Sequence, residues 1–166
     1  MKYLTQLFIS LWICSIAIAQ DSRPNILLIL IDDLRYDALG ATGHPFFESP
    51  SIDRIANEGV LFENSFVVQS LCSPSRASIY TGMYPHIHGV VNNNKSLNHS
   101  EYTTIAEELH NSGYETAFIG KYQMGNDGTP EPGYDRWVTL QSENRFYNPI
   151  FSIDNQDTLI EIQGHV

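Results

Sequence analysis

The hydrophobic pattern of the chain is strongest at residues 26–31, where six apolar side chains follow one another without a polar interruption. An unbroken run of this kind, made only of Ile and Leu, is typical of a strand buried on both faces of a parallel sheet. The run ends abruptly at Asp32 and Asp33. We therefore predict a buried strand over residues 26–31 with two carboxylates at its carboxyl end.

Strand and helix patterns alternate along the following part of the chain. Residues 51–59 are predicted to form a helix, because Ile52 and Ile55 share one face and Gly59 is a typical helix stop. The further predicted elements are a strand over 60–68, a helix over 72–82, a helix over 105–112 capped by Thr104 and Glu107 and ended by Gly113, and a strand over 114–119. This alternation predicts an α/β layer fold.

Beyond Gly125 the pattern weakens. A stretch rich in glycine and proline predicts a loop, and residues 134–138 are consistent with either a short strand or an edge element. We find no internal repeat or linker that would mark a second complete domain. Three or four strands make a thin α/β sheet, so the pattern predicts a fold that is incomplete at the carboxyl end.

The first nineteen residues have the pattern of a secretory signal peptide. Lys2 precedes a nearly apolar stretch over residues 7–18, and Ala17 and Ala19 form a small-x-small cleavage site. The alternative is a membrane anchor, but the apolar stretch is shorter than the roughly 20 residues that a bilayer span needs. We expect cleavage, export to the periplasm or the medium, and no membrane attachment afterwards.

The chain is acidic, with a net charge of -10 that becomes -11 once the leader and its Lys2 are removed. Such a charge argues against nucleic acid or anionic membrane surfaces as partners. It does not argue against an anionic substrate, because a few local cations can dominate one pocket.

Removal of the leader also leaves Cys72 as the only cysteine, unpaired in a protein bound for an oxidising compartment. A buried inert cysteine is one explanation, yet the polar residues 73–76 make a poor core sequence. Only three residues separate Cys72 from Arg76, so this is not the Cys-x5-Arg loop of cysteine phosphatases. Pro74 suits the first turn of a helix and Gly82 its left-handed stop, which would place Cys72 where helix amides favour an anion.

Two further places carry candidate chemistry. The hard oxygen donors of Asp32 and Asp33 suit Ca²⁺ or Mg²⁺, although an isolated pair could also cap a turn, face solvent or pair with Arg35. Residues 113–125 deliver Lys121 into a glycine-flanked turn, where its ammonium could meet an oxyanion at close range. An exposed lysine is the alternative there.

Together these segments resemble the amino-terminal part of a formylglycine-dependent, arylsulfatase-like sulfatase of the alkaline phosphatase superfamily. Residues 24–33 resemble its first strand and metal-binding pair, residues 72–82 its cysteine modification signature, and residues 113–121 its second signature. Residues 132–138 and 147–149 resemble members acting on glycans. The resemblance implies a partial alkaline-phosphatase-like mixed sheet with helices on both faces, with residues 1–19 as signal peptide and residues 20–166 as a truncated catalytic domain.

The resemblance also implies roles for individual residues. Asp32, Asp33 and position 72 would bind Ca²⁺, with Mg²⁺ possible, and a maturation enzyme would oxidise Cys72 to formylglycine. Arg76 would fix the aldehyde hydrate and Lys121 would bind a sulfate oxygen. In the hydrate one hydroxyl attacks sulfur, and the other collapses the sulfated intermediate to aldehyde and releases sulfate.

One departure from the family pattern bears on this mechanism. Gln123 stands where the family usually has a histidine; it could bind substrate through a hydrogen bond but carries no titrating proton near neutral pH.

The expected function is therefore hydrolysis of sulfate esters, either in sulfated glycans or in aryl sulfates, with glycans favoured. Family members are several hundred residues long, so we expect low or no activity from this chain by itself. The alternatives are a phosphomonoesterase or phosphodiesterase of the same superfamily and a non-catalytic, truncated glycan-binding product.

Overall fold

The computed structural model describes residues 23–125, 128–141, 147–154 and 159–164. It divides into two units, Met1–Ile31 and Asp32–Val166, which are considered separately. The predicted signal peptide, residues 1–19, lies outside the described residues. The elements of the second unit are η1 (Gly40–Thr42), α2 (Pro50–Glu58), α3 (Cys72–Thr81), α4 (Pro85–His88), α5 (Ile105–Asn111), β1 (Ala117–Gly120), β2 (Arg136–Leu140), β3 (Ile150–Ile153) and β4 (Leu159–Glu161).

The prediction of a strand over residues 26–31 is wrong in this structure. The segment has no regular secondary structure, and its apolar side chains are exposed, Leu27 to 83% and Ile29 to 65%. A buried strand needs neighbouring strands and covering layers. The apolar run shows that the segment requires such neighbours, but no strand among the described residues pairs with it.

The strand predicted over residues 60–68 is also absent. These residues form an irregular segment whose large apolar side chains are exposed, as Phe62 and Phe66 illustrate. The reason is the same, because β-branched and aromatic residues favour a strand only when another strand and a packed face are available to them. Both errors therefore concern long-range pairing and not local preference.

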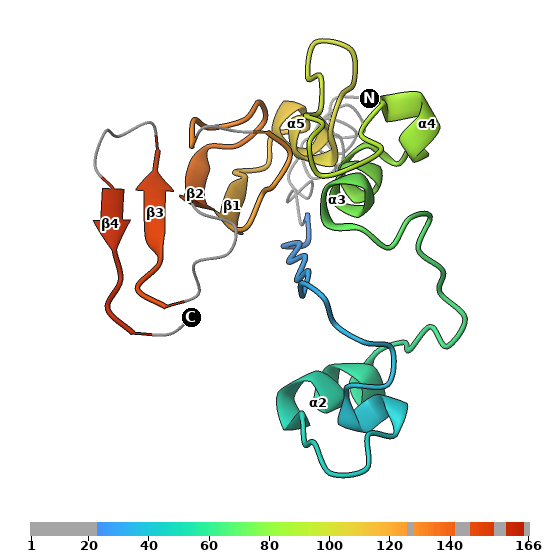
Figure 1. The fold of residues 1–166 in the computed structure, drawn as a ribbon. Coiled ribbons are helices and arrows are strands. Elements are labelled where there is room, and N and C mark those ends of the chain that lie inside the picture. Colours follow the sequence, from blue (N-terminus) through green and yellow to red (C-terminus); the bar gives the residue numbers. More distant parts are fainter. Residues whose placement is uncertain (1–22, 126–127, 142–146, 155–158, 165–166) are drawn as a thin grey trace, which may run out of the picture. The chain divides into compact units, whose positions relative to one another are not determined.

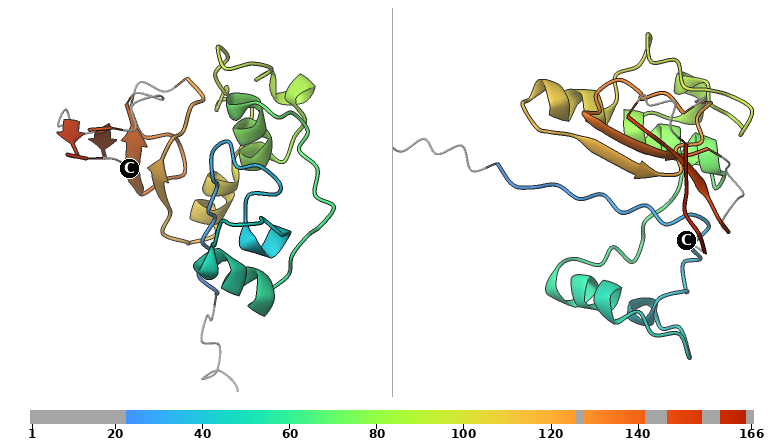
Figure 2. Two further views of the ribbon diagram at one scale, coloured as in Figure 1. Left: turned by 60° about the horizontal axis from the view of Figure 1, so that its bottom comes forward. Right: turned by 90° about the vertical axis from the view of Figure 1, so that its left-hand side faces the viewer.

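The sheet of the second unit is mixed, with strand order β1-β2-β3-β4. Its strands lie edge to edge in Figures 1 and 2. Strands β1 and β2 pair in parallel, whereas β2 with β3 and β3 with β4 pair antiparallel. The strand anticipated near residues 134–138 is β2, which is an interior strand and not an edge. The α/β class with a mixed sheet is confirmed, while the short strands β3 and β4 were not predicted from the sequence.

Local sequence signals correctly predicted the end of α3 and the start of α5. Helix α3 ends at Gly82, whose φ of 69° is the left-handed conformation that favours glycine. Helix α5 begins with the predicted capping box, in which Thr104 Oγ1 accepts from the Glu107 amide and the Glu107 carboxylate accepts from the Thr104 amide. None of the helices in the described ranges has the length and apolar character that a membrane crossing requires.

The core of the second unit forms around Trp137 of β2, which is fully buried. Its ring lies 4.7 Å from Phe118, 5.1 Å from Tyr122 and 5.2 Å from Tyr134, measured between centroids. Ala77 and Tyr80 add the inner face of α3 to the same cluster. Aromatic packing thus connects the helix that carries Cys72 to the loop that carries Lys121, because Tyr122 follows that lysine directly.

A close approach of backbones explains one glycine in the segment between β1 and β2. Gly133 has a φ of 87°, and a Cβ atom there would lie 2.4 Å from the Glu107 amide nitrogen. The start of α5 therefore packs directly on this turn. The Pro132 to Gly133 signal of the sequence reflects a steric requirement as well as a turn.

Helix α4 contacts α3 through a buried histidine, and the two helices lie side by side in Figures 1 and 2. The Nδ1 atom of His88 accepts from the Val90 amide at 3.1 Å, so Nε2 carries the proton and donates to Ser78 Oγ at 3.0 Å. Burial lowers the pKa of His88, and the charge of His86 adds to this against an opposing backbone hydrogen bond. His88 is therefore a neutral structural residue.

Replacing Trp137 by alanine should lower the free energy of unfolding by about 3–5 kcal/mol, because it leaves a large cavity in the only aromatic cluster identified within the described core. Phe66→Ala is the control, since Phe66 is 86% exposed and its removal should change stability by less than about 0.5 kcal/mol. Urea denaturation followed by circular dichroism measures both. Equal losses in the two variants would contradict this account of the core.

The stability of the protein should fall as the pH drops below the ordinary histidine pKa of about 6.5. A lowered pKa in the folded state means that the unfolded chain binds more protons, so the contribution of His88 is present above that pH and is lost in acid. His88→Gln should flatten the dependence of the urea midpoint on pH between pH 5 and 8. Parallel curves for the two proteins would show that His88 does not titrate in this way.

Candidate active site

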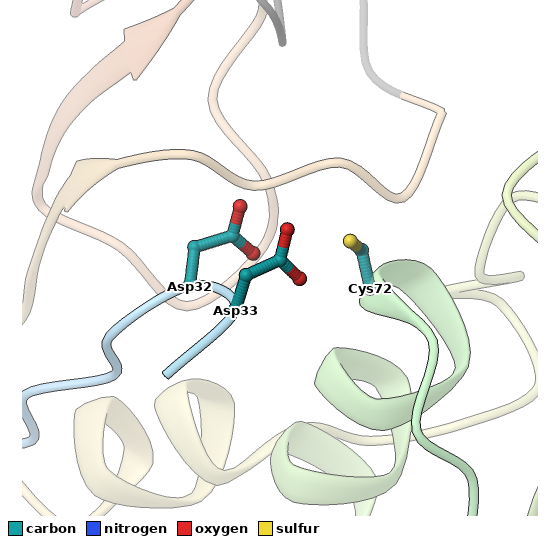
Figure 3. A group of neighbouring side chains, drawn as sticks. All are labelled: Asp32, Asp33 and Cys72. Atoms are coloured by element: carbon teal, nitrogen blue, oxygen red, sulfur yellow. The ribbon is translucent and has the colours of Figure 1, made fainter. Parts of the chain in front are cut away.

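The two predicted metal-binding carboxylates lie in a turn at the start of the second unit. Asp33 has a φ of 52°, a left-handed conformation that is uncommon for residues other than glycine. Figure 3 shows both carboxylates directed toward Cys72. Aspartate adopts this conformation more readily than most residues, and it suits the turn in which Asp33 lies.

Cys72 is the first residue of α3, as predicted, and is partly buried. One ligand atom from each of Asp32, Asp33 and Cys72 can be chosen so that all three lie within 4.8 Å of one another. The amino terminus of this ten-residue helix carries partial positive charge from its free amides. Position 72 thus lies beside two carboxylates at a helix end that favours an anion.

Arg76 lies one helical turn after Cys72 and is only 5% exposed. Its Nη2 atom donates to Asp32 Oδ1 at 3.0 Å, and its Nη1 atom donates to the backbone carbonyl of Lys121. One guanidinium therefore joins α3, the acidic turn and the loop after β1. The fixed fork geometry of arginine suits a residue that must hold two acceptors at once.

Lys121 follows β1 and reaches the same group. Its Nζ atom lies 2.8 Å from Asp32 Oδ2 and 4.0 Å from Cys72 Sγ. The lysine side chain is 13% exposed. The exposed surface lysine considered from the sequence is therefore not what the structure contains.

Charge pairing dominates the electrostatics at Asp32. Partial burial by itself would raise the pKa of Asp32, but the hydrogen bonds and charges of Lys121 and Arg76 outweigh it and hold that pKa below its usual range. The carboxylate is consequently ionised and paired through both oxygens.

The donor set fits a divalent cation in part. Two carboxylates provide the hard oxygens that Ca²⁺ and Mg²⁺ prefer, but the third donor atom is a thiol sulfur, which is soft. An oxygen at position 72 in place of sulfur would make all three donors hard. The group is therefore an acidic metal-binding candidate whose third ligand depends on the chemical state of residue 72.

Gln123, predicted to bind substrate, lies two residues beyond Lys121 and is buried. Its φ of 55° is in the left-handed region. Its backbone carbonyl accepts a hydrogen bond from the hydroxyl of Ser73 at 2.5 Å. The sequence did not reveal this contact, because the two residues are fifty positions apart. Only the position of Ser73 directly after Cys72 could have drawn attention to it.

A second residue that the sequence did not identify is Asn93. Its Oδ1 atom accepts from the Ser73 amide at 3.1 Å and so acts as a cap for α3, which Leu71 at the N-cap position cannot provide. The run of three asparagines over residues 92–94 was the available signal.

The assembled group can hold an anion and a cation next to each other. Lys121, Arg76 and the start of α3 supply positive charge, while Asp32 and Asp33 supply negative charge. Residue 72 lies beside both sets, with its sulfur 4.0 Å from Lys121 Nζ and within 4.8 Å of a carboxylate oxygen of each aspartate. Such an arrangement suits a reaction in which a nucleophile at position 72 attacks an anionic ester.

Comparison with known proteins agrees with this geometry. The family model for sulfatases matches residues 24–158. The N-acetylglucosamine-6-O-sulfatase of Bacteroides thetaiotaomicron is 35% identical over 140 residues, which cover 82% of this chain and 24% of that protein. The ulvan-active sulfatase of Formosa agariphila is 36% identical over 154 residues, covering 87% and 29%. The chain thus spans about a quarter of the length of the curated relatives it matches.

A solved structure has the same arrangement of the backbone. It is described as a complex with its substrate D-glucosamine-2-N,6-O-disulfate, and it superposes with a TM-score of 0.78 at 34% identity. The matched region covers 87% of this chain and 28% of the solved one. The family match, the relatives and the shared fold lead to one conclusion, which is that the chain belongs to the sulfatase family.

Proposed function

We propose that the protein hydrolyses sulfate esters of glycans, and that this chain supplies its nucleophile, part of its cation site and a sulfate-binding lysine. The observation that carries the proposal is the position of Cys72, at the start of α3 beside Asp32 and Asp33 and 4.0 Å from the ammonium of Lys121. A core cysteine would have apolar neighbours. The charged surroundings of this cysteine support a catalytic role instead.

Cys72 is the proposed precursor of formylglycine. When formed, this group supplies a hydrated carbonyl with two hydroxyls on one carbon, one to displace the alcohol from sulfur and one to release sulfate. The hard oxygen that it would place among the carboxylates of Asp32 and Asp33 also completes a hard donor set. Two inferences, about the nucleophile and about the cation, thus favour the same change at position 72.

Ca²⁺ is the proposed cation, and Mg²⁺ is the alternative, with Asp32, Asp33 and position 72 as ligands. When bound, the cation supplies positive charge that acidifies a hydroxyl and offsets the charge of the ester. Asp32 can orient Arg76 and Lys121 at the same time, because each of its oxygens already accepts from one of them.

The remaining residues position and stabilise the anion. Lys121 is placed to contact a sulfate oxygen, and Arg76 holds the lysine loop to α3 through the Lys121 carbonyl. Gln123 can donate a hydrogen bond to the substrate but cannot transfer a proton near neutral pH. Any acid that protonates the leaving group must therefore be another residue.

The substrate class is inferred from the relatives. The two reported relatives are named for N-acetylglucosamine-6-O-sulfate and ulvan chemistry, and the solved neighbour is described with a glucosamine disulfate. A sulfated carbohydrate is therefore preferred over an aryl sulfate. The acidic charge of the chain supports neither nucleic acid nor an anionic membrane as a partner.

The biological setting follows from the same proposal. A protein with the predicted signal peptide would be exported to the periplasm or secreted, and a formylglycine-generating enzyme would be its maturation partner. Because the chain spans about a quarter of its relatives, we expect it to turn over sulfate esters slowly or not at all by itself. The alternative for the isolated chain is thus a non-catalytic, truncated product that binds glycan.

The decisive experiment is to express the chain together with a working maturation enzyme and to examine the peptide around Cys72 by mass spectrometry and by capture with a hydrazide probe. We expect an aldehyde in the wild-type chain and none in Cys72→Ala, because the carbonyl comes from the cysteine. A retained thiol in the presence of active maturation enzyme would overturn the proposal. Faster hydrolysis of an aryl phosphate than of the paired aryl sulfate would favour the phosphatase alternative.

Asp33→Asn should weaken Ca²⁺ binding by at least about tenfold, a loss of roughly 1.4 kcal/mol in binding free energy, because it removes one of two charged hard ligands. Asp33 is preferred to Asp32 for this test, since Asp32 also holds Arg76 and Lys121. Isothermal titration calorimetry on the matured chain measures the affinity.

Asp37→Asn is the matched control, because Asp37 lies four residues away and pairs with Arg35 in solvent. The Asp37→Asn variant should bind Ca²⁺ with the same affinity as the wild-type chain. Equal affinities in all three proteins would show that Asp33 is not a ligand.

A further inference from the structure

Ser73 lies next to the proposed nucleophile, yet its side chain is turned away from solvent and is 0% exposed. Its hydroxyl donates to the backbone carbonyl of Gln123 at 2.5 Å, across fifty positions of sequence. Its amide donates to Asn93 Oδ1 at 3.1 Å. The hydroxyl and the amide of Ser73 thus both hold other segments of the chain.

The acceptor of this bond is in an unusual conformation. Gln123 has a φ of 55°, which costs free energy for any residue that has a side chain. Such a conformation persists when surrounding contacts hold it, and a buried hydrogen bond to its carbonyl is a contact of that kind. The bond from Ser73 therefore helps to define the course of the chain just after Lys121.

The loop over residues 121–125 has two other backbone anchors. The carbonyl of Lys121 accepts from Arg76, and the carbonyl of Met124 accepts from the Leu97 amide at 3.3 Å. Of these anchors, the one from Ser73 starts at the residue bonded directly to Cys72. It therefore couples the loop most closely to the position of the nucleophile.

We propose that Ser73 is a positioning residue, whose hydroxyl sets the separation between Lys121 and residue 72 through the carbonyl of Gln123. The role of Lys121 toward sulfate rests on the proposed function, whereas the coupling of the two segments does not. Without the hydroxyl, the Gln123 backbone carbonyl loses this bond to α3, while the bond from Arg76 to the Lys121 carbonyl still ties the loop to the helix. The backbone after Lys121 is then less strongly fixed, and the lysine ammonium is held near residue 72 less precisely.

The test compares Ser73→Ala with Ser152→Ala. Ser152 is a matched control because its buried hydroxyl also donates to a loop carbonyl, that of Gly128, at 3.0 Å, but from β3. Each variant removes one buried hydrogen bond, so both should lose similar global stability in urea denaturation. Native-state hydrogen exchange of residues 121–125 and calorimetric titration with inorganic sulfate then report on the site.

We expect exchange in residues 121–125 to become roughly tenfold faster in Ser73→Ala, and sulfate affinity to fall by about three- to tenfold, as for the loss of one buried hydrogen bond. Both quantities should remain at wild-type values in Ser152→Ala. Equal changes in the two variants, or none in Ser73→Ala, would overturn the positioning role. If the wild-type chain binds no sulfate, the proposed function is weakened, while the exchange comparison still decides the role of Ser73.

Discussion

The site depends on the double pairing of Asp32. One oxygen of this carboxylate accepts from Arg76 and the other from Lys121, and these three residues come from the acidic turn, α3 and the loop after β1. Arg76 closes the group by donating to the Lys121 carbonyl. The Arg76 guanidinium is buried and the other two groups are partly buried, and charges in such surroundings are stable when they are paired and hydrogen-bonded.

This arrangement also gives an acidic chain a local group of cations. The net charge of the chain is negative, but two cations, a helix amino terminus and two carboxylates gather around residue 72, and both cations pair with Asp32. Local geometry, and not net charge, determines which ions are attracted over a few ångströms. All five of these side chains lie within the region that matches the sulfatase family model.

Sequence reasoning succeeded where the information was local. Thr104 with Glu107 correctly predicted the start of α5, and Gly82 correctly predicted the end of α3, because capping and left-handed turns depend on neighbouring residues. The strand predictions for residues 26–31 and 60–68 were wrong. These apolar segments would form strands only if partner strands paired with them, and no strand among the described residues does so. The gathering of Asp32, Cys72 and Lys121 was anticipated through family resemblance, whereas the Ser73 to Gln123 bond has no local signature and was not.

The burial of the segment around the cysteine has a consequence for the order of events during biosynthesis. Ser73 and Pro74 are almost completely inaccessible in the folded chain, and Arg76 is inserted between two other segments. An enzyme that recognises these residues as a linear peptide therefore needs them before the helix docks. Lys121 lies 49 residues after Cys72 in the sequence, so Ser73 and Arg76 remain accessible during synthesis until that later segment has been made and folds against them.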